Sequence, residues 1–521
     1  MTVPRIRIGE HAREPKPDST EGSAAQQRVE LKKVPPELGR LEFSHNKSTS
    51  SRKALPVKVS HKFIDGSAMF DEDNLVSCAG LVPVMALAEH TRLPDLLAEK
   101  VSITTTKVAS GAANPGPKLL TLIAGMCAGA DSIDDIDLLR SGGMKHLFGN
   151  VYAPSTVGTL LREFSFGHAR QLESVLREHL IALTARVDIL PGLAEQAFID
   201  IDSLLRPVYG HAKQGASYGH TKIAGRQILR KGLSPLATTL STADSTPIIT
   251  GMRLRAGKAG SGKGAGRMVT QAIVTARTAG ATGALVVRGD SAYGTRSVIS
   301  ACLRAKVCFS LVLAKNTAVQ RAIDSIPDDA WTPVRYPGAV RDPDTGAWIS
   351  DAEVAETAYT AFASTKAPVT ARLIVRRVKD ARFPDALFPV WRYHPFFTNI
   401  TAPAADADVT HRRHAIIETV FADLIDGPLA HMPSGRFGAN SAWVLCAAIA
   451  HNLLRAAGVL AGGGHARARG ATLRRKIVNL PARLCRPQRK PILRLPTHWP
   501  WSGAWLRLWT NTIGHSPPAI A

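Results

Sequence analysis

The hydrophobic pattern first appears well inside the chain. Residues 1–60 are rich in Pro, Ser, Lys and Glu and show no apolar periodicity, which predicts a disordered basic tail. Between 61 and 192, apolar residues recur every three to four positions, as in LVSCAGLVPVMALAEH, KLLTLIAGMCAG and STVGTLLREFSFGHARQLESVLREHLIAL. This spacing gives each segment one apolar helical face and predicts a helical domain.

After a Pro-Gly pair, apolar residues recur at every second position instead of every third or fourth. The stretch AFIDIDS (197–203) predicts a strand with Ile199 and Ile201 on one face. Asp200 and Asp202 then share the opposite face, because successive side chains of a strand alternate.

Further elements follow in an order typical of a mixed α/β core. A β-prone stretch, TPIITGMRLRA (246–256), leads into a Gly-rich loop, a helical stretch, MVTQAIVTARTAG (268–280), and a buried strand, ALVV (284–287). Between about 320 and 400 the pattern breaks into WTPVRYP, GAWIS, ARLIVRRV and LFPVWRYHPFFTN. These read as short strands separated by turn residues and predict a β-rich insertion.

Helical periodicity returns in HRRHAIIETVFADLIDG and NSAWVLCAAIAHNLLRAAGVL. His451 and Asn452 lie on the second of these segments, where the apolar context favours core packing with a polar cap interaction over DNA contact. Near the C-terminus, Trp499, Trp501, Trp505 and Trp509 occur together with Arg494 and Arg507. Stacking on unpaired bases is one interpretation, and packing onto the core is the preferred one.

Composition and charge narrow the partners. The 521 residues are 45% apolar, enough for two to four domains with cores. Lys and Arg total 65 against 42 Asp and Glu, a net charge of +23 that favours a polyanion such as nucleic acid or an anionic membrane surface. The six cysteines are scattered without a CxxC pair, so neither a zinc site nor a disulfide framework is predicted. No apolar signal segment and no uninterrupted apolar run of about 18 residues is found, so we expect a cytoplasmic protein without a membrane partner.

The candidate chemistry lies in four carboxylates. In ALVVRGDSAYG a buried strand ends in Asp290, and an unpaired buried charge is costly, so Asp290 needs a partner, solvent or a metal. Together with Asp200, Asp202 and Glu418 it could supply the oxygen ligands that Mg²⁺ prefers. Two such ions about 4 Å apart can act on a phosphodiester. Taken singly, an Asp at a strand end is more often a cap or turn residue.

Three segments in this order, FIDIDS, LVVRGDSAYG and HRRHAIIETVFADL, resemble the DDE transposases of bacterial insertion sequences, in particular the transposase DDE domain group 1 family. The resemblance covers most of residues 65–460. It implies an RNase H-like core whose catalytic and metal-binding triad is Asp202, Asp290 and Glu418, with two Mg²⁺ ions for which Mn²⁺ can substitute. Asp200 is the alternative first acid and a further candidate metal ligand.

The segment around Glu418 departs from the Tyr-Arg-Glu-Lys signature of many such transposases. His411 and His414 occupy the Tyr and Arg offsets. The adjacent Arg412 and Arg413 are therefore predicted to make the DNA contacts. His414 lies one helical turn before Glu418, where it either approaches the metal site or is a structural histidine.

The Gly-rich loop GKAGSGKG (257–264) nearly matches a nucleotide-binding phosphate loop. The Ser or Thr hydroxyl that would bind Mg²⁺ is replaced by Gly264, so we do not predict a nucleotide site. Lys258 and Lys263 are instead predicted to contact DNA phosphates.

Pattern and resemblance together predict an α/β protein: an RNase H-like mixed-sheet catalytic core with a β-rich insertion domain and an N-terminal helical domain. The expected divisions are a disordered basic tail (1–60), a helical DNA-binding domain (61–192), the first part of the core (193–318), the β-rich insertion (319–405), the C-terminal helices of the core (406–460) and a basic tail (461–521).

The expected function is that of an insertion-sequence transposase. It would cut double-stranded DNA at terminal inverted repeats and join the 3′-hydroxyl ends to target DNA, as a homodimer on DNA associated with the nucleoid. The alternatives are a nuclease or recombinase on the same core without strand transfer, and an inactive or domesticated DNA-binding protein.

Overall fold

The structure is a computed structural model that describes residues 67–104, 111–223, 226–260, 262–383 and 387–514. The chain divides into two units, Met1–Met69 and Phe70–Ala521. Of the first unit only residues 67–69 are described, so the tail predicted over 1–60 lies outside the described residues.

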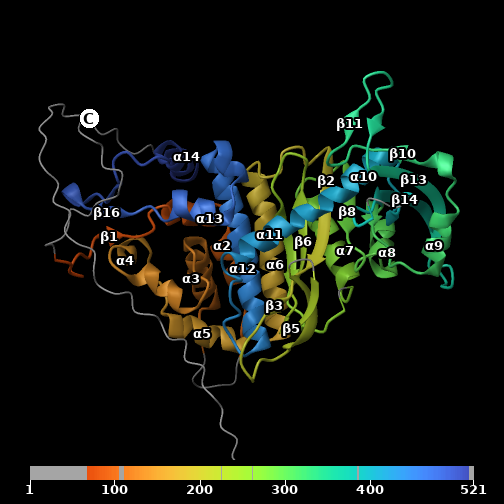
Figure 1. Cartoon of the computed structure of the whole chain (residues 1–521). Coiled ribbons are helices and arrows are strands. Elements are labelled where there is room, and N and C mark those ends of the chain that lie inside the picture. Colours follow the sequence, from red (N-terminus) through yellow and green to blue (C-terminus); the bar gives the residue numbers. More distant parts are fainter. Residues whose placement is uncertain (1–66, 105–110, 224–225, 261, 384–386, 515–521) are drawn as a thin grey trace, which may run out of the picture. The chain divides into compact units, whose positions relative to one another are not determined.

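A nine-stranded mixed sheet is the largest sheet of the second unit (Figure 1). Its strand order is β10-β13-β14-β15-β9-β8-β2-β6-β7. The strands are β2 (Gln196–Ser203), β6 (Leu236–Ser241), β7 (Ile248–Arg253), β8 (Ala284–Gly289), β9 (Cys308–Leu311), β10 (Thr332–Pro333), β13 (Ala352–Ala361), β14 (Val369–Lys379) and β15 (Trp391–Thr398). The strands predicted from AFIDIDS, TPIITGMRLRA and ALVV are thus confirmed as β2, β7 and β8.

Fourteen α-helices lie in the described part of the chain. They are α1 (Leu81–His90), α2 (Leu93–Lys100), α3 (Pro115–Ala128), α4 (Met144–Leu147), α5 (Pro154–Glu163), α6 (Phe166–Arg186), α7 (Ala265–Thr278), α8 (Arg296–Arg304), α9 (Thr317–Asp324), α10 (Ala404–Arg412), α11 (Ile417–Ile425), α12 (Phe437–Ala461), α13 (Gly470–Leu473) and α14 (Ser502–Ile513).

The strands β2, β8 and β9 run parallel at the centre of the sheet, and β6 is antiparallel to both β2 and β7. The helix α7 connects β7 to β8, and α8 connects β8 to β9, as parallel neighbours require a crossover helix. This arrangement brings the carboxyl ends of β2 and β8 to one edge of the sheet.

The two faces of β2 meet different helices. A side chain at Gly251 of β7 would contact Met268 of α7, and the register places Thr238 and Ile201 on that same face. Asp200 and Asp202 therefore point to the opposite face, as predicted from the alternation. In Figure 1, α10 and α11 cross in front of this part of the sheet.

The region predicted as a β-rich insertion, 319–405, is rich in strands but continues the main sheet. Strand β15 pairs with β9, and β14 and β13 follow outward as a long antiparallel hairpin. Among the described strands of this region, only the short pair β11 (Val340–Arg341) and β12 (Trp348–Ile349) stands apart from that sheet.

A small antiparallel sheet lies between β2 and β6 in the sequence. It consists of β3 (Arg206–Pro207), β4 (Ser217–Ile223) and β5 (Arg226–Leu233). The hydrophobic pattern does not predict it, because YGHAKQGASYGHTK carries too few apolar residues to show an alternation.

The predicted helices of 61–192 are confirmed as α1 to α6, but they are built around a helix from the C-terminal part of the chain. Helix α12 packs against α3, α5 and α6 and against the strand β7. By length and composition α12 could cross a membrane, yet 89% of its most apolar stretch is buried within the protein. That degree of burial is what a core helix shows.

Residues 461–514 were predicted as a basic tail, and the structure corrects this prediction. Strand β16 (Ala482–Cys485) pairs with β1 (Leu75–Val76) and with β17 (Ile492–Arg494), and α14 packs on α1 and α12. Trp505 is buried and stacks with Trp509, so the tryptophans serve packing. The basic residues of this segment obscured its apolar positions because they alternate with them at short range.

Asn452 joins α12 to the edge of the main sheet. Its side-chain oxygen accepts a hydrogen bond from the backbone N–H of Ile249 (2.8 Å), and its amide donates to the Ile249 carbonyl (2.8 Å). Both residues are buried, and Ile249 lies on the edge strand β7. This confirms the core role predicted for Asn452, since the side chain replaces a missing neighbouring strand.

We expect Asn452→Ala to lower the free energy of unfolding by about 2–4 kcal/mol, because it leaves a buried N–H and a buried C=O without partners. Urea denaturation measures the loss. The exposed Asn511 donates a comparable bond to the Leu460 carbonyl, and Asn511→Ala should cost less than about 1 kcal/mol. Equal losses in the two variants would contradict this role for Asn452.

Candidate active site

Asp202 and Asp290 meet at neighbouring strand ends. Ile201 of β2 is the parallel partner of Gly289 of β8, so the next residue on each chain is one of the two aspartates. Neighbouring strands lie about 4.8 Å apart. The structure thus brings together two acids separated by 88 positions in the sequence.

Local hydrogen bonds orient both carboxylates. Asp202 accepts a bond from the backbone N–H of Ser203 (2.6 Å), and Asp290 accepts one from the N–H of Ala292 (2.9 Å). The second bond forms an Asx turn that ends β8. Asp202 is half-buried and Asp290 is exposed, so a ligand can reach this edge of the sheet.

Tyr293 and Arg255 lie close enough to the acids for their charges to interact. Burial raises the pKa of the Tyr293 hydroxyl, and the negative charges of Asp202 and Asp290 raise it further. Burial lowers the pKa of Arg255, and Tyr293 and Asp202 oppose that change. The guanidinium of Arg255 also donates to the carbonyls of Gly260 (3.4 Å) and Lys263 (3.3 Å), which ties the Gly-rich loop to the site.

Asp200 has a different environment from Asp202 although the two share a face. Arg288 Nε donates to Asp200 Oδ1 (2.7 Å), and Nη2 donates to Oδ2 (2.8 Å). Both side chains are about 2% exposed. Burial raises the pKa of Asp200, and the Arg288 guanidinium opposes this rise. Both carboxylate oxygens of Asp200 are therefore engaged within the protein.

Arg288 also connects the sheet to the segment that carries Glu418. Its Nη1 donates to the carbonyl of Thr410 on α10 (3.0 Å), and its guanidinium lies over the ring of Phe198 (4.2 Å). The short helix η3 (Arg413–Ile416) leads from α10 into α11. Glu418 lies in the first turn of α11, and its side chain is exposed.

The structure brings Asp202 and Asp290 together but does not complete the predicted triad. In the described ranges, no three His, Cys, Asp or Glu side chains lie close enough together to hold a metal ion. The donor chemistry nevertheless fits Mg²⁺, which is commonly held by one or two carboxylates and completed by substrate phosphates.

The two histidines before Glu418 are held by the fold. His411 is buried, stacks on Phe396 at 4.3 Å and lies 2.9 Å from the Ser310 hydroxyl. His414 Nδ1 lies 2.6 Å from the His411 carbonyl oxygen. These contacts support the structural alternative for His414.

The predicted DNA-contacting residues fall into two groups. Arg412 is bound to the buried Asp408 (2.9 Å), which also pairs with Arg376. Arg413, Lys258 and Lys263 are exposed, the last two on the Gly-rich loop. Exposure leaves these three open to a partner, whereas Arg412 has a structural ion pair.

Sequence reasoning missed Tyr293, Arg255 and Arg288 as members of this site. Two of them stand beside Asp290 in RGDSAYG, so proximity in sequence was an available signal. Arg255 had none, because its position depends on backbone pairing with Ser234, which is a tertiary contact.

Carboxylates at adjacent strand ends in a strongly basic chain are typical of enzymes that act on nucleic-acid phosphodiesters. The sequence matches the family described as transposase DDE domain group 1 over residues 61–516, and the chain belongs to this family of DDE transposases. The match extends through the C-terminal segment 461–514 that folds onto the core. No curated protein shows significant similarity to the chain.

The two aspartates of β2 should respond differently to amide substitution. Asp200→Asn leaves the buried Arg288 without its counter-charge and should lower the free energy of unfolding by about 3–5 kcal/mol. Asp202→Asn on the same strand should change it by less than about 1 kcal/mol, since it removes a partly exposed charge near Asp290. Chemical denaturation of both variants compares them, and similar losses would contradict the assigned environments.

Stability should fall as the pH is lowered below about 6.5. Burial lowers the pKa of His411 to about 3 and that of His179 to about 3, whereas the unfolded chain titrates near 6.5. The unfolded state therefore binds more protons between these values, and acid favours it. His411→Gln should reduce the pH dependence by up to about 1.4 kcal/mol per pH unit, the value for one proton. Denaturation curves at roughly pH 4 to 7 measure this slope. An unchanged slope in His411→Gln would contradict a neutral buried His411.

Proposed function

We propose that this protein is the DNA transposase of an insertion sequence. It cuts double-stranded DNA at terminal inverted repeats and joins the 3′-hydroxyl ends to target DNA. The observation that carries the proposal is the pairing of Asp202 and Asp290 at adjacent ends of β2 and β8 in a chain of the DDE family.

An RNase H-like core is part of the same proposal. Its strands, in order, are β7, β6, β2, β8 and β9. Adjacent strands among the first three are antiparallel, and β8 and β9 run parallel to β2. The strands of 319–405 extend that sheet between the second acid and Glu418. The helical part, 61–192, is also proposed to bind DNA.

Asp202, Asp290 and Glu418 are proposed as the metal ligands. Bound Mg²⁺, or Mn²⁺ in its place, would increase the acidity of the attacking hydroxyl or water and stabilise the charge on the leaving oxygen. The residues of the chain position these groups: Ser203 and Ala292 orient the two aspartates through backbone N–H groups. Glu418 reaches the pair from the exposed first turn of α11 when DNA is bound.

Arg288 and Asp200 are proposed as positioning residues. They hold β2, β8 and α10 in one arrangement, which fixes where α11 presents Glu418. Because both carboxylate oxygens of Asp200 are bonded by Arg288, the proposal takes Asp202 rather than Asp200 as the first acid of the triad.

DNA phosphates are the proposed partners of Arg413, Lys258 and Lys263, because these side chains are exposed and the chain carries +23. Arg412 is not included among these residues, because it forms an ion pair with Asp408. A homodimer bridging two DNA ends and a nucleoid location in the cytoplasm complete the proposal.

Each of Asp202→Asn, Asp290→Asn and Glu418→Gln should abolish Mg²⁺-dependent cleavage, a loss of at least about 1,000-fold, because each removes a proposed metal ligand. Binding to the same DNA in EDTA should remain within about threefold of wild type, since phosphate contacts supply most of the affinity. The assay uses a labelled duplex of the DNA that borders the gene, with Mg²⁺ and with EDTA.

Strand joining is scored in the same reactions with a supercoiled target. Cleavage without joining would favour the nuclease alternative. Binding without cleavage in either Mg²⁺ or Mn²⁺ would contradict the proposal and favour an inactive DNA-binding protein. Arg321→Gln, on the exposed surface of α9, is the control that should keep full activity.

A further inference from the structure

A groove lies between α7 and α8, on the face of the sheet opposite the Asp200 side chain. It has a volume of about 890 Å³. Its lining residues are Gly264, Gly266, Arg267, Thr270, Gln271, Arg296, Ser297, Ser300 and Arg304.

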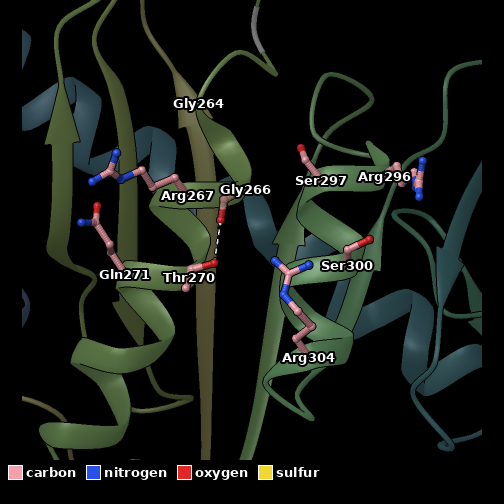
Figure 2. A pocket seen from close by; sticks show the side chains of 9 residues that line it. All are labelled: Gly264, Gly266, Arg267, Thr270, Gln271, Arg296, Ser297, Ser300 and Arg304. Carbon is pink, nitrogen blue, oxygen red and sulfur yellow. Dashed lines mark hydrogen bonds between the residues drawn. The ribbon is translucent and has the colours of Figure 1, made fainter. Parts of the chain in front are cut away.

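The groove is basic and polar. Three of its nine lining residues are arginines, four carry hydroxyl or amide side chains, and none of these described residues is acidic. Figure 2 shows Arg304 pointing into the gap between the helices, while Arg267 and Arg296 extend to either side. All three arginines are exposed.

The arginines of the groove are not engaged in ion pairs within the described part of the chain. Burial raises the pKa of Glu173 and the positive charge of Arg267 opposes this rise, but the carboxylate of Glu173 is already bonded by Arg253 and Arg170. Exposed, unneutralised guanidinium groups repel one another, so a polyanion that neutralises them is the complementary partner.

The groove begins where the loop after Asp290 ends. Helix α8 starts at Arg296, and a side chain at Gly262 of the Gly-rich loop would lie 3.1 Å from the Ala292 carbonyl oxygen. Glycine at 266 lets α7 approach α8 closely, since a Cβ there would lie 2.7 Å from the Ser297 carbonyl oxygen. The groove therefore continues from the edge that carries the paired carboxylates.

The size of the groove suits a nucleic-acid backbone. Arg296 and Arg304 stand at the two ends of α8, about 12 Å apart along the helix axis at 1.5 Å per residue. At about 3.4 Å of rise per nucleotide in one strand, this distance covers roughly three steps of a duplex. The planar guanidinium fork matches phosphate oxygens, and hydroxyl and amide groups are common additional donors.

We propose that the groove between α7 and α8 binds the sugar–phosphate backbone of DNA next to the phosphodiester that is cut. This inference rests on the proposed transposase function and locates where the enzyme holds its substrate. The contacts are with phosphates, so they position the duplex without reading its sequence.

The test compares Arg267→Gln/Arg304→Gln with wild-type protein in fluorescence anisotropy with two labelled duplexes, one of the DNA bordering the gene and one of unrelated sequence. EDTA is present, so no cleavage step contributes. The double variant should bind both duplexes on the order of 10- to 30-fold more weakly near 0.15 M salt, and the slope of log K against log salt should shrink by about two.

Two further variants control for charge and folding. Arg267→Lys/Arg304→Lys retains both positive charges and should keep most of the affinity and the full salt slope. Arg321→Gln removes an exposed arginine from α9, outside the groove, and should leave both unchanged. The melting temperatures of all variants should match that of wild type, because the substituted side chains are exposed.

Wild-type affinity and salt slope in the folded double glutamine variant would overturn the groove proposal while leaving the transposase proposal intact. The same holds if only the duplex bordering the gene is affected, since phosphate contacts are independent of sequence. Failure of the transposase proposal has a different signature, namely the absence of metal-dependent cleavage by the wild-type protein.

Discussion

The buried ion pair between Asp200 and Arg288 is the constraint on which the candidate site depends. Two hydrogen bonds join the side chains across β2 and β8, and a third joins Arg288 to the Thr410 carbonyl on α10. Removing one partner would leave an uncompensated charge in the interior, which is strongly unfavourable. The pair therefore fixes the register of the two strands, and this register places Asp202 and Asp290 side by side at their ends.

The sequence FIDIDS divides two functions between alternate positions of one strand. Asp200 points to the interior and holds neighbouring elements together. Asp202, two residues further along the strand, lies at the partly exposed edge. On the other face of the sheet, α7 and α8 present exposed arginines along a groove that begins at the loop after Asp290. An enzyme that acts on DNA needs both features. Carboxylates at the strand edge can hold a cation, and basic side chains along the adjoining groove can neutralise the phosphates of the substrate.

Much of this arrangement could be predicted from sequence because it depends on local pattern. Alternation in AFIDIDS predicted β2 and the shared face of its aspartates, and the apolar run before Asp290 predicted β8. The roles of Asp200 and Arg288 could not be separated from those of their neighbours, since partnership across strands is a tertiary contact. Likewise, β15 joining β9 and the C-terminal segment packing on α1 and α12 depend on long-range pairing, which leaves no periodic signal in either segment alone.

The most direct test of the central claim is Mn²⁺ binding to the protein–DNA complex, measured by electron paramagnetic resonance with wild-type, Asp202→Asn and Asp290→Asn proteins on the same duplex. The paired-carboxylate site predicts Mn²⁺ uptake by the wild-type complex that is lost in both variants, with free DNA as the baseline. Equal uptake by the wild-type and Asp290→Asn complexes would contradict the claim that the adjacent ends of β2 and β8 hold the catalytic cation.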